Sequence, residues 1–182
     1  MAMTTMIKGA HLEIRPLRME DERSFREAVA EAAAEVPPWP FAFGWSDGMS
    51  FSEYVERVSA WERGESLPEG FVPAGYYVVV VGGEIAGRLS VRFGLNDYLA
   101  EIGGHIGYAV RTAYRGRGYA TAMLREALGI CAGRGMTRVL VTCHADNAGS
   151  RKVIERCGGV YERSTPDPDG RAEMRRYWVT TG

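Results

Sequence analysis

The pattern of hydrophobic and polar residues changes near position 75. Up to that point the chain is rich in helix formers and aromatic residues, whereas beyond it β-branched and aromatic residues run in stretches of strand length. In the first part we predict a short edge strand over residues 12–16 and two helices. The first helix covers residues 21–34 and stops before Pro37 and Pro38, and the second begins at a capping box at residues 50–53.

The second part predicts a mixed α/β arrangement of strands and two helices. Residues 76–81 and 85–95 flank the turn-forming pair Gly82-Gly83, which predicts a hairpin. A helix beginning near Gly118 has apolar residues three and four positions apart, which indicates one buried face. Further strands are expected at 102–111, 138–143 and 173–179, and a further helix at 147–157.

Composition and charge narrow the classes of function. The 182 residues are 46% hydrophobic, enough for one compact domain, and the formal net charge of -1 gives no basic field for nucleic acid. No stretch approaches the ~20 apolar residues that a membrane span needs. We therefore expect a cytoplasmic protein with neither nucleic acid nor membrane as a partner.

Three cysteines and three histidines are scattered along the chain. Their spacing matches neither a disulfide framework nor a set of metal ligands, so we expect reduced thiols and no metal. The neighbouring pair Cys143-His144 suggests one hypothesis, in which Cys143 is a nucleophile and His144 its base. Neighbours on a strand point to opposite faces, however, so Cys143 is predicted to be a small core residue.

The segment Tyr-Arg-Gly-Arg-Gly-Tyr-Ala-Thr at 114–121 joins a predicted strand to a predicted helix. Gly116 and Gly118 let the backbone approach a ligand, and the helix N-terminus favours an anion. Arg115 and Arg117 add groups that suit phosphate oxygens. The segment lacks the Gly-Lys-Ser/Thr ending of a triphosphate loop and the third glycine of a dinucleotide fingerprint. A tight turn without a ligand remains the alternative.

These residues resemble the acetyl-CoA signature of the GCN5-related N-acetyltransferase (GNAT) superfamily, Gln/Arg-x-x-Gly-x-Gly/Ala, at Arg115, Gly118 and Ala120. The run Asn-Ala-Gly-Ser-Arg-Lys-Val-Ile-Glu at 147–155 is similar to a later helix of that family, and residues 104–110 are similar to its central splayed strand. Within this family, the chain most resembles a branch of bacterial predicted acetyltransferases, because it has their Gly-Gly-His-Ile-Gly-Tyr strand at 103–108 and their Gly-Gly end of the later helix at 158–159.

The resemblance implies an α/β (α+β) GNAT fold, a central, mostly antiparallel splayed mixed sheet flanked by helices. One domain would span 1–182, with acceptor-side helices and the first strand at 1–75, an acetyl-CoA-binding core at 76–162 and a C-terminal turn and strand at 163–182. The implied reaction is direct acetyl transfer from acetyl-CoA to a primary amine of a small molecule, protein or peptide. A non-catalytic acyl-CoA-binding or regulatory protein and a domain without a ligand are the alternatives, and a homodimer is left open.

The resemblance assigns the cofactor to a strand backbone, the glycine-rich turn and a helix start, with the N–H of Val110 facing the thioester oxygen. Asn147 and Ser150 could equally cap a helix. The complete set expected to bind acetyl-CoA is Tyr108, Ala109, Val110, Arg115, Gly116, Arg117, Gly118, Tyr119, Ala120, Thr121, Asn147 and Ser150.

Two residues are candidates for the general base. His105 has an ordinary pKa of ~6.5 and can accept a proton near neutral pH, and Glu101 is the reserve because alternation along a regular strand would set both on one face. Ile154 stands where many relatives have a tyrosine acid, so the usual leaving-group acid is missing. Aromatic residues at 39–45 and Trp61 could line an acceptor groove, although most are predicted to pack in the core.

Overall fold

Two neighbouring strands rich in β-branched residues form the centre of the structure. β3 (Ala74–Val81) and β4 (Glu84–Arg92) pair antiparallel through the turn at Gly82 and Gly83, as predicted. Both glycines have a positive φ, 60° and 82°, which most side chains disfavour, so this tight turn requires them. Every residue of the two strands is buried or half-buried, so the sheet needs cover on both faces.

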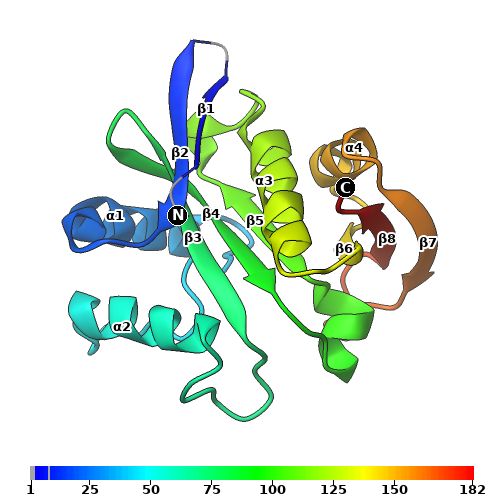
Figure 1. The fold of residues 1–182 in the computed structure, drawn as a ribbon, viewed down its shortest axis with the longest axis horizontal. Helices are drawn as coiled ribbons and strands as arrows, with labels where there is room; N and C mark the ends of the chain where they lie inside the picture. Colours follow the sequence, from blue (N-terminus) through cyan, green and yellow to red (C-terminus); the bar gives the residue numbers. More distant parts are fainter. Residues whose placement is uncertain (1–2, 8) are drawn as a thin grey trace.

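The computed structural model describes residues 3–7 and 9–182, in which eight strands form one sheet in the order β1-β2-β3-β4-β5-β6-β8-β7 (Figure 1). All neighbouring strands pair antiparallel except β5 and β6, which confirms the predicted mixed, mostly antiparallel fold class. The other strands are β1 (Met3–Ile7), β2 (Ala10–Pro16), β5 (Ile106–Val110), β6 (Arg138–His144), β7 (Val160–Thr165) and β8 (Met174–Thr180), and the α-helices are α1 (Glu22–Ala34), α2 (Phe51–Glu62), α3 (Tyr119–Gly133) and α4 (Ala148–Arg156).

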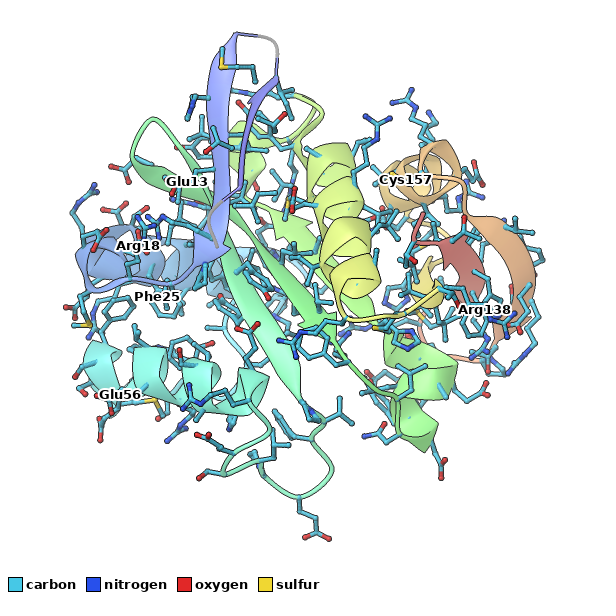
Figure 2. All side chains as sticks on the ribbon, in the orientation of Figure 1. Glu13, Arg18, Phe25, Glu56, Arg138 and Cys157 are labelled. Atoms are coloured by element: carbon cyan, nitrogen blue, oxygen red, sulfur yellow. The ribbon has the colours of Figure 1, made fainter. Side chains whose placement is uncertain are left out.

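The helices divide between the two faces of the sheet. Met123 of α3 belongs to a buried cluster with Leu89 and Val91 of β4, and α4 adds its own side chains to this cluster. On the other face Phe25 of α1, labelled in Figure 2, packs against Tyr54 of α2, with ring centroids 5.2 Å apart. Burying one such large side chain stabilises the fold by about 1.5–3 kcal/mol. The sheet therefore separates two hydrophobic cores.

β5 and β6 meet at one register position only, Ile106 opposite Val141. Beside this point Gly104 has a φ of 61°, and an added Cβ there would lie 2.7 Å from the carbonyl oxygen of Leu140. Glycine thus allows the two chains to approach at this end. No further pairing of β5 with β6 occurs within the described residues, so the strands part after Ile106. This parting confirms the predicted splay.

The two outer parts of the sheet differ from the prediction. The strand predicted at residues 12–16 is present as β2, but its expected position at the edge is wrong, because β1 pairs along the outside of β2, with Thr5 opposite Leu12. β7 is also an unexpected strand, which pairs with β8. Most of β7 is exposed at the edge of the sheet, so its sequence shows no hydrophobic alternation.

The strand predicted at 102–111 is shorter than expected. Residues Leu99–Gly103 form a π-helical turn instead, because the side chain of Asn96 accepts the N–H of Leu99 at 2.9 Å and its carbonyl accepts the N–H of Ala100 at 2.8 Å. β5 begins only at Ile106. Glu101 therefore lies off the strand, and the expectation that Glu101 and His105 share a strand face is wrong.

The helices agree closely with the sequence pattern. α1 covers Glu22–Ala34, and the capping box that opens α2 forms as predicted, with Ser50 Oγ accepting the N–H of Glu53 at 3.2 Å. The carboxylate of Glu53 in turn accepts the N–H of Ser50 at 2.8 Å. Within the described part of the chain, no helix has both the length and the apolar character needed to cross a membrane.

Candidate active site

The gap between β5 and β6 exposes main-chain hydrogen-bonding groups. Odd-numbered residues of β5 bond towards β4, as the bond from the N–H of Arg111 to the carbonyl of Ala86, 2.9 Å, indicates. Alternation along the strand then points the peptide groups of Tyr108 and Val110 towards β6, while those of Ala109 point towards β4. Because β6 has already diverged, no acceptor among the described residues pairs with the N–H groups of Tyr108 and Val110, and they can bind another molecule.

The N-terminus of α3 lies just beyond the carboxyl end of β5. Gly118 is the N-cap residue with a φ of 91°, and it supplies no capping side chain. The first N–H groups of α3 therefore lack a side-chain acceptor, and together with the helix dipole they favour an anion. Gly118 is exposed and Ala120 half-buried, whereas the side chain of Tyr119 is 3% exposed and belongs to the core. Only the main chain of Tyr119 can therefore serve a ligand.

The two arginines of the glycine-rich turn are already engaged. Arg115 donates from Nη2 to both carboxylate oxygens of Glu35 on the α1 side, 2.8 Å each, and from Nε to the carbonyl of Val110 at 2.9 Å. Arg117 donates to the carbonyl of Ala113 at 2.9 Å. Both side chains thus brace the turn, and Gly116, with a φ of 74°, lies between them.

A groove of about 540 Å³ continues from Gly118 along α3. Thr121 lines it, together with Arg125 of α3 and Arg156 of α4, which place two exposed guanidinium groups beside the helix N-terminus. The sequence analysis missed these two arginines. Arg125 follows Thr121 by one helical turn, so the helical period could have indicated it, whereas Arg156 comes from another helix and becomes visible only in the fold.

The start of α4 connects to β5 through two hydroxyl groups. Asn147 caps the helix, its side chain accepting the N–H of Ser150 at 2.9 Å, so the capping alternative holds for its side chain. Ser150 Oγ lies 2.8 Å from the hydroxyl of Tyr108, whose pKa is raised by burial. Ile154 is completely buried in the core below. A hydroxyl pair therefore lies on the α4 side of the gap, where the position of Ile154 offers only hydrocarbon.

His105 closes the narrow end of the gap. Its N–H donates to the carbonyl of Leu140 at 2.7 Å, and its ring Nδ1 accepts the N–H of Leu140 at 2.9 Å. Accepting this bond requires the lone pair of Nδ1, so the ring proton lies on Nε2 and neither nitrogen has a free lone pair. Burial also lowers the pKa of His105. The role of His105 as general base stays a prediction, whereas its two hydrogen bonds with Leu140 indicate a structural role.

Glu101 lies on the π-helical turn, away from the gap. Arg163 of β7 donates to both of its carboxylate oxygens at 2.7 Å, and Arg176 Nη1 lies 3.7 Å away. The hydrogen bond from Arg163 lowers the pKa of this exposed carboxyl. A paired carboxylate with a lowered pKa is a weak base, so the structure offers no support for its reserve role.

A separate pocket of about 230 Å³ lies on the α2 face of the sheet. Tyr54 and Trp61 of α2 form one wall, and Tyr76, Ser90 and Arg92 of β3 and β4 form another. Phe43 also lines the pocket, whereas Phe41 is buried in the adjoining core. The aromatic residues therefore divide between core and pocket, and most of this wall is apolar.

The cysteines show no sign of activation. All three are free, and burial raises the pKa of Cys143 to about 11, which keeps its thiol protonated near neutral pH. His144, on the opposite side of the strand, lies 3.4 Å from a carboxylate oxygen of Asp167. Among residues 3–7 and 9–182, no group of three or more His, Cys, Asp or Glu side chains could hold a metal ion.

Comparisons with known proteins give a consistent result for family and fold. The family model described as acetyltransferase (GNAT) domain matches residues 11–160. Mycobacterium smegmatis RimJ in complex with CoA-disulfide is 20% identical with a TM-score of 0.70, covering 98% of this chain and 86% of that one. Ribosomal-protein-S5-alanine acetyltransferase from Vibrio fischeri is 16% identical with a TM-score of 0.70, covering 98% and 97%.

RimL, a ribosomal L7/L12 alpha-N-protein acetyltransferase solved in complex with coenzyme A, is 18% identical with a TM-score of 0.68, and 98% of each chain is covered. These three structures share the fold of this chain. A comparison with curated protein sequences gives no significant match.

The structural role of His105 predicts a pH-dependent stability. Since its pKa is lowered in the folded state, the unfolded state binds more protons below the ordinary value of ~6.5, so stability is full above that pH and falls as the pH drops. His105→Asn keeps an acceptor near Nδ1 and should flatten this dependence. His105→Ala leaves the N–H of Leu140 unpaired and should cost about 1–3 kcal/mol at pH 8.

Urea unfolding of the three proteins between pH 5 and 8 measures both effects. A wild-type protein whose unfolding free energy follows the same pH profile as His105→Asn would contradict this assignment.

Proposed function

Because the chain belongs to the GNAT acetyltransferase family, we propose that it transfers the acetyl group of acetyl-CoA to a primary amine by direct attack in a ternary complex. The observation that carries this proposal is the succession, along the chain, of β5 with its open edge and the N-terminus of α3, which has no capping side chain at Gly118. The helix start offers amide groups for an anion, and the open edge of β5 offers strand N–H groups. These groups suit a diphosphate joined to a pantetheine chain.

The order of these groups along the chain orients the cofactor. The diphosphate lies at the N–H groups of residues 118–120, with Arg125 and Arg156 beside it, and the amides of pantetheine pair with the main chain of β5. Val110 is the nearer strand residue to the turn, and Tyr108 is the farther one. The N–H of Tyr108 therefore lies closer to the thioester than that of Val110, and it polarises the carbonyl oxygen on which charge develops.

The leaving coenzyme A thiolate requires a hydrogen-bond donor. The hydroxyl pair of Tyr108 and Ser150, 2.8 Å apart, lies on the α4 side of the gap and supplies it. Full proton transfer from Tyr108 is unfavourable, because its pKa is raised whereas a thiol has a pKa of only ~8.5. A hydrogen bond to the thiolate is sufficient, so the proposed transfer does not require a tyrosine acid at the position of Ile154.

The acceptor amine must reach the thioester in its neutral form. Among the residues that the structure describes, no carboxylate lines the pocket on the α2 face, and the positive charge of Arg92 in its wall disfavours an ammonium group nearby. The amine therefore loses its proton to water on entry and attacks the carbonyl carbon. The bond from that carbon to sulfur then breaks, the nitrogen releases its extra proton to solvent to give the amide, and the thiolate takes up a proton from solvent.

A coenzyme A release assay with a panel of small amines, lysine peptides and peptides with free N-termini tests the proposal. We expect turnover with one class of amine, a rate that rises with pH up to the pKa of that amine, and no acetylated enzyme intermediate. Cys143→Ala should retain most activity because its thiol is buried and protonated, and His105→Asn should keep the pH profile.

Tyr108→Phe serves as the matched variant in this assay, since it removes one hydroxyl and keeps the ring. Its kcat should fall about tenfold with little change in the KM for acetyl-CoA. Tight binding of acetyl-CoA without turnover of any amine would favour the alternative of a non-catalytic acyl-CoA-binding protein.

Cofactor binding itself is tested at the N-terminus of α3. Gly118→Val places a β-branched side chain in the path of the diphosphate and should weaken acetyl-CoA binding by roughly 100-fold or more. Gly170→Val is the control, because Gly170 also has a positive φ, 70°, and an added Cβ there meets nothing within 4 Å. Calorimetric titration of both folded variants measures the affinities. Equal affinity in the two variants would remove the diphosphate from this turn.

A further inference from the structure

Two arginines of β4 lie on the same face of the sheet as the α2 pocket. Alternation along β4 sends the side chains of Leu89 and Val91 into the core beneath α3, so Arg88, Ser90 and Arg92 point to the opposite face. Ser90 and Arg92 line the pocket, and Arg88 stands behind Ser90, its Nη1 3.4 Å from Ser90 Oγ.

The guanidinium groups converge on β5 at one point. An added Cβ at Gly107 would lie 3.5 Å from Arg88 Nη1, 3.7 Å from Arg92 Nη1 and 3.1 Å from Ser90 Oγ. Gly107 directly precedes Tyr108, whose N–H faces the gap on the other side of the strand. The two positive charges are therefore close to the thioester expected beside Tyr108.

Neither arginine has a carboxylate partner among the described residues. Arg88 is 7% exposed, donates to the carbonyl of Pro40 at 3.2 Å, lies 4.7 Å above the ring of Phe43, and has an Nε that is buried without a hydrogen-bond partner. Arg92 donates to the carbonyls of Gly103 and Gly104 at 3.1 Å each. Burial lowers the pKa of Arg88, and that of Arg92 to about 10.

Among the described residues, the two fully buried arginines besides Arg88 are paired with carboxylates. Arg15, 4% exposed, makes a two-pronged ion pair with Asp21, with distances of 2.7 and 2.8 Å. Arg176, 6% exposed, pairs with Glu162 at 2.8 Å. Buried cations are normally neutralised in this way, so the buried guanidinium of Arg88 beside that of the half-buried Arg92, both with only neutral partners, indicates a site for an anion from outside the chain.

The pocket beside these charges is apolar and small. Its volume of about 230 Å³ is below the ~300–1,000 Å³ typical of sites for drug-sized ligands, so it suits one side chain or a similarly small group. Phe71 and Tyr98 line the pocket, and 46% and 60% of their surfaces are exposed. Burying such exposed aromatic rings against an apolar group of a ligand is energetically favourable.

We propose that the acceptor carries a carboxylate within a few bonds of its reactive amine, bound by Arg92 with Arg88 as the second positive charge, and an apolar group that fills the aromatic pocket. The inference rests on the proposed acetyl transfer, because the short distance between amine and carboxylate follows from the position of both arginines beside the thioester. The carboxylate can belong to a free amino acid or to an acidic side chain at the second position of a peptide N-terminus.

Matched pairs of acceptors distinguish these two sources. One arm compares leucine and phenylalanine with their amides, and the other compares C-terminally amidated peptides beginning Ala-Asp or Ala-Glu with those beginning Ala-Asn or Ala-Gln. We expect kcat/KM to favour the carboxylate member by at least roughly tenfold in one arm. Arg92→Gln should abolish most of this preference, Arg92→Lys should keep part of it, and the KM for acetyl-CoA should stay within about twofold in both variants.

Calorimetric titration of the same probes into the coenzyme A complex separates binding from chemistry. Arg92-dependent binding of carboxylate probes without turnover would support the anion site and reject the proposed acetyl transfer. Turnover that is equal or better with the neutral members of both arms would overturn the anion site and leave acetyl transfer standing.

Two further outcomes would also overturn the anion site. One is the absence of binding by every probe in both arms. The other is an Arg92-dependent preference for succinyl-CoA over acetyl-CoA with neutral amines, since it would assign the carboxylate to the donor. Arg88→Met provides the second variant, because it removes a buried, unpaired charge without removing an ion pair and should fold while losing the preference.

Discussion

The separation of β5 from β6 is the constraint on which the rest of the site depends. A strand inside a sheet normally forms main-chain hydrogen bonds with both neighbouring strands. β5 pairs with β6 only at Ile106, and its side facing β6 is open after that residue. His105 and Gly104 hold the closed end, through the two hydrogen bonds with Leu140 and the close approach that a glycine permits. Beyond them the N–H groups of Tyr108 and Val110 keep their bonding capacity for a ligand.

The two faces of the sheet offer different binding surfaces. On the α3 and α4 face, two exposed arginines line a groove that begins at Gly118, the N-cap residue of α3. On the α1 and α2 face, an aromatic pocket is lined by Ser90 and Arg92, whose side chains lie beside Gly107 of β5. A donor and an acceptor can therefore approach one point of the strand from opposite sides, which is the geometry that direct transfer in a ternary complex requires.

The sequence predicted those parts of the molecule whose cause is local. The glycine-rich turn and the cap of α4 depend on neighbouring residues, and both occupy the predicted places. The π-helical turn was missed because the capping contact of Asn96 competes with a strand pattern that looks continuous. The bond between the ring of His105 and Leu140 joins residues 35 positions apart, and the lack of a carboxylate near Arg88 depends on the whole fold. Neither could be read from the chain alone.

Amide hydrogen exchange followed by NMR tests the central claim most directly, because it reports on individual peptide groups of β5. In the free protein the N–H groups of Tyr108 and Val110 should exchange faster than that of Ala109, which is bonded within the sheet. On addition of coenzyme A, exchange at Tyr108 and Val110 should slow by roughly tenfold or more while that at Ala109 changes little. Unchanged exchange at both residues in the saturated complex would contradict the claim that the open edge of β5 holds the cofactor.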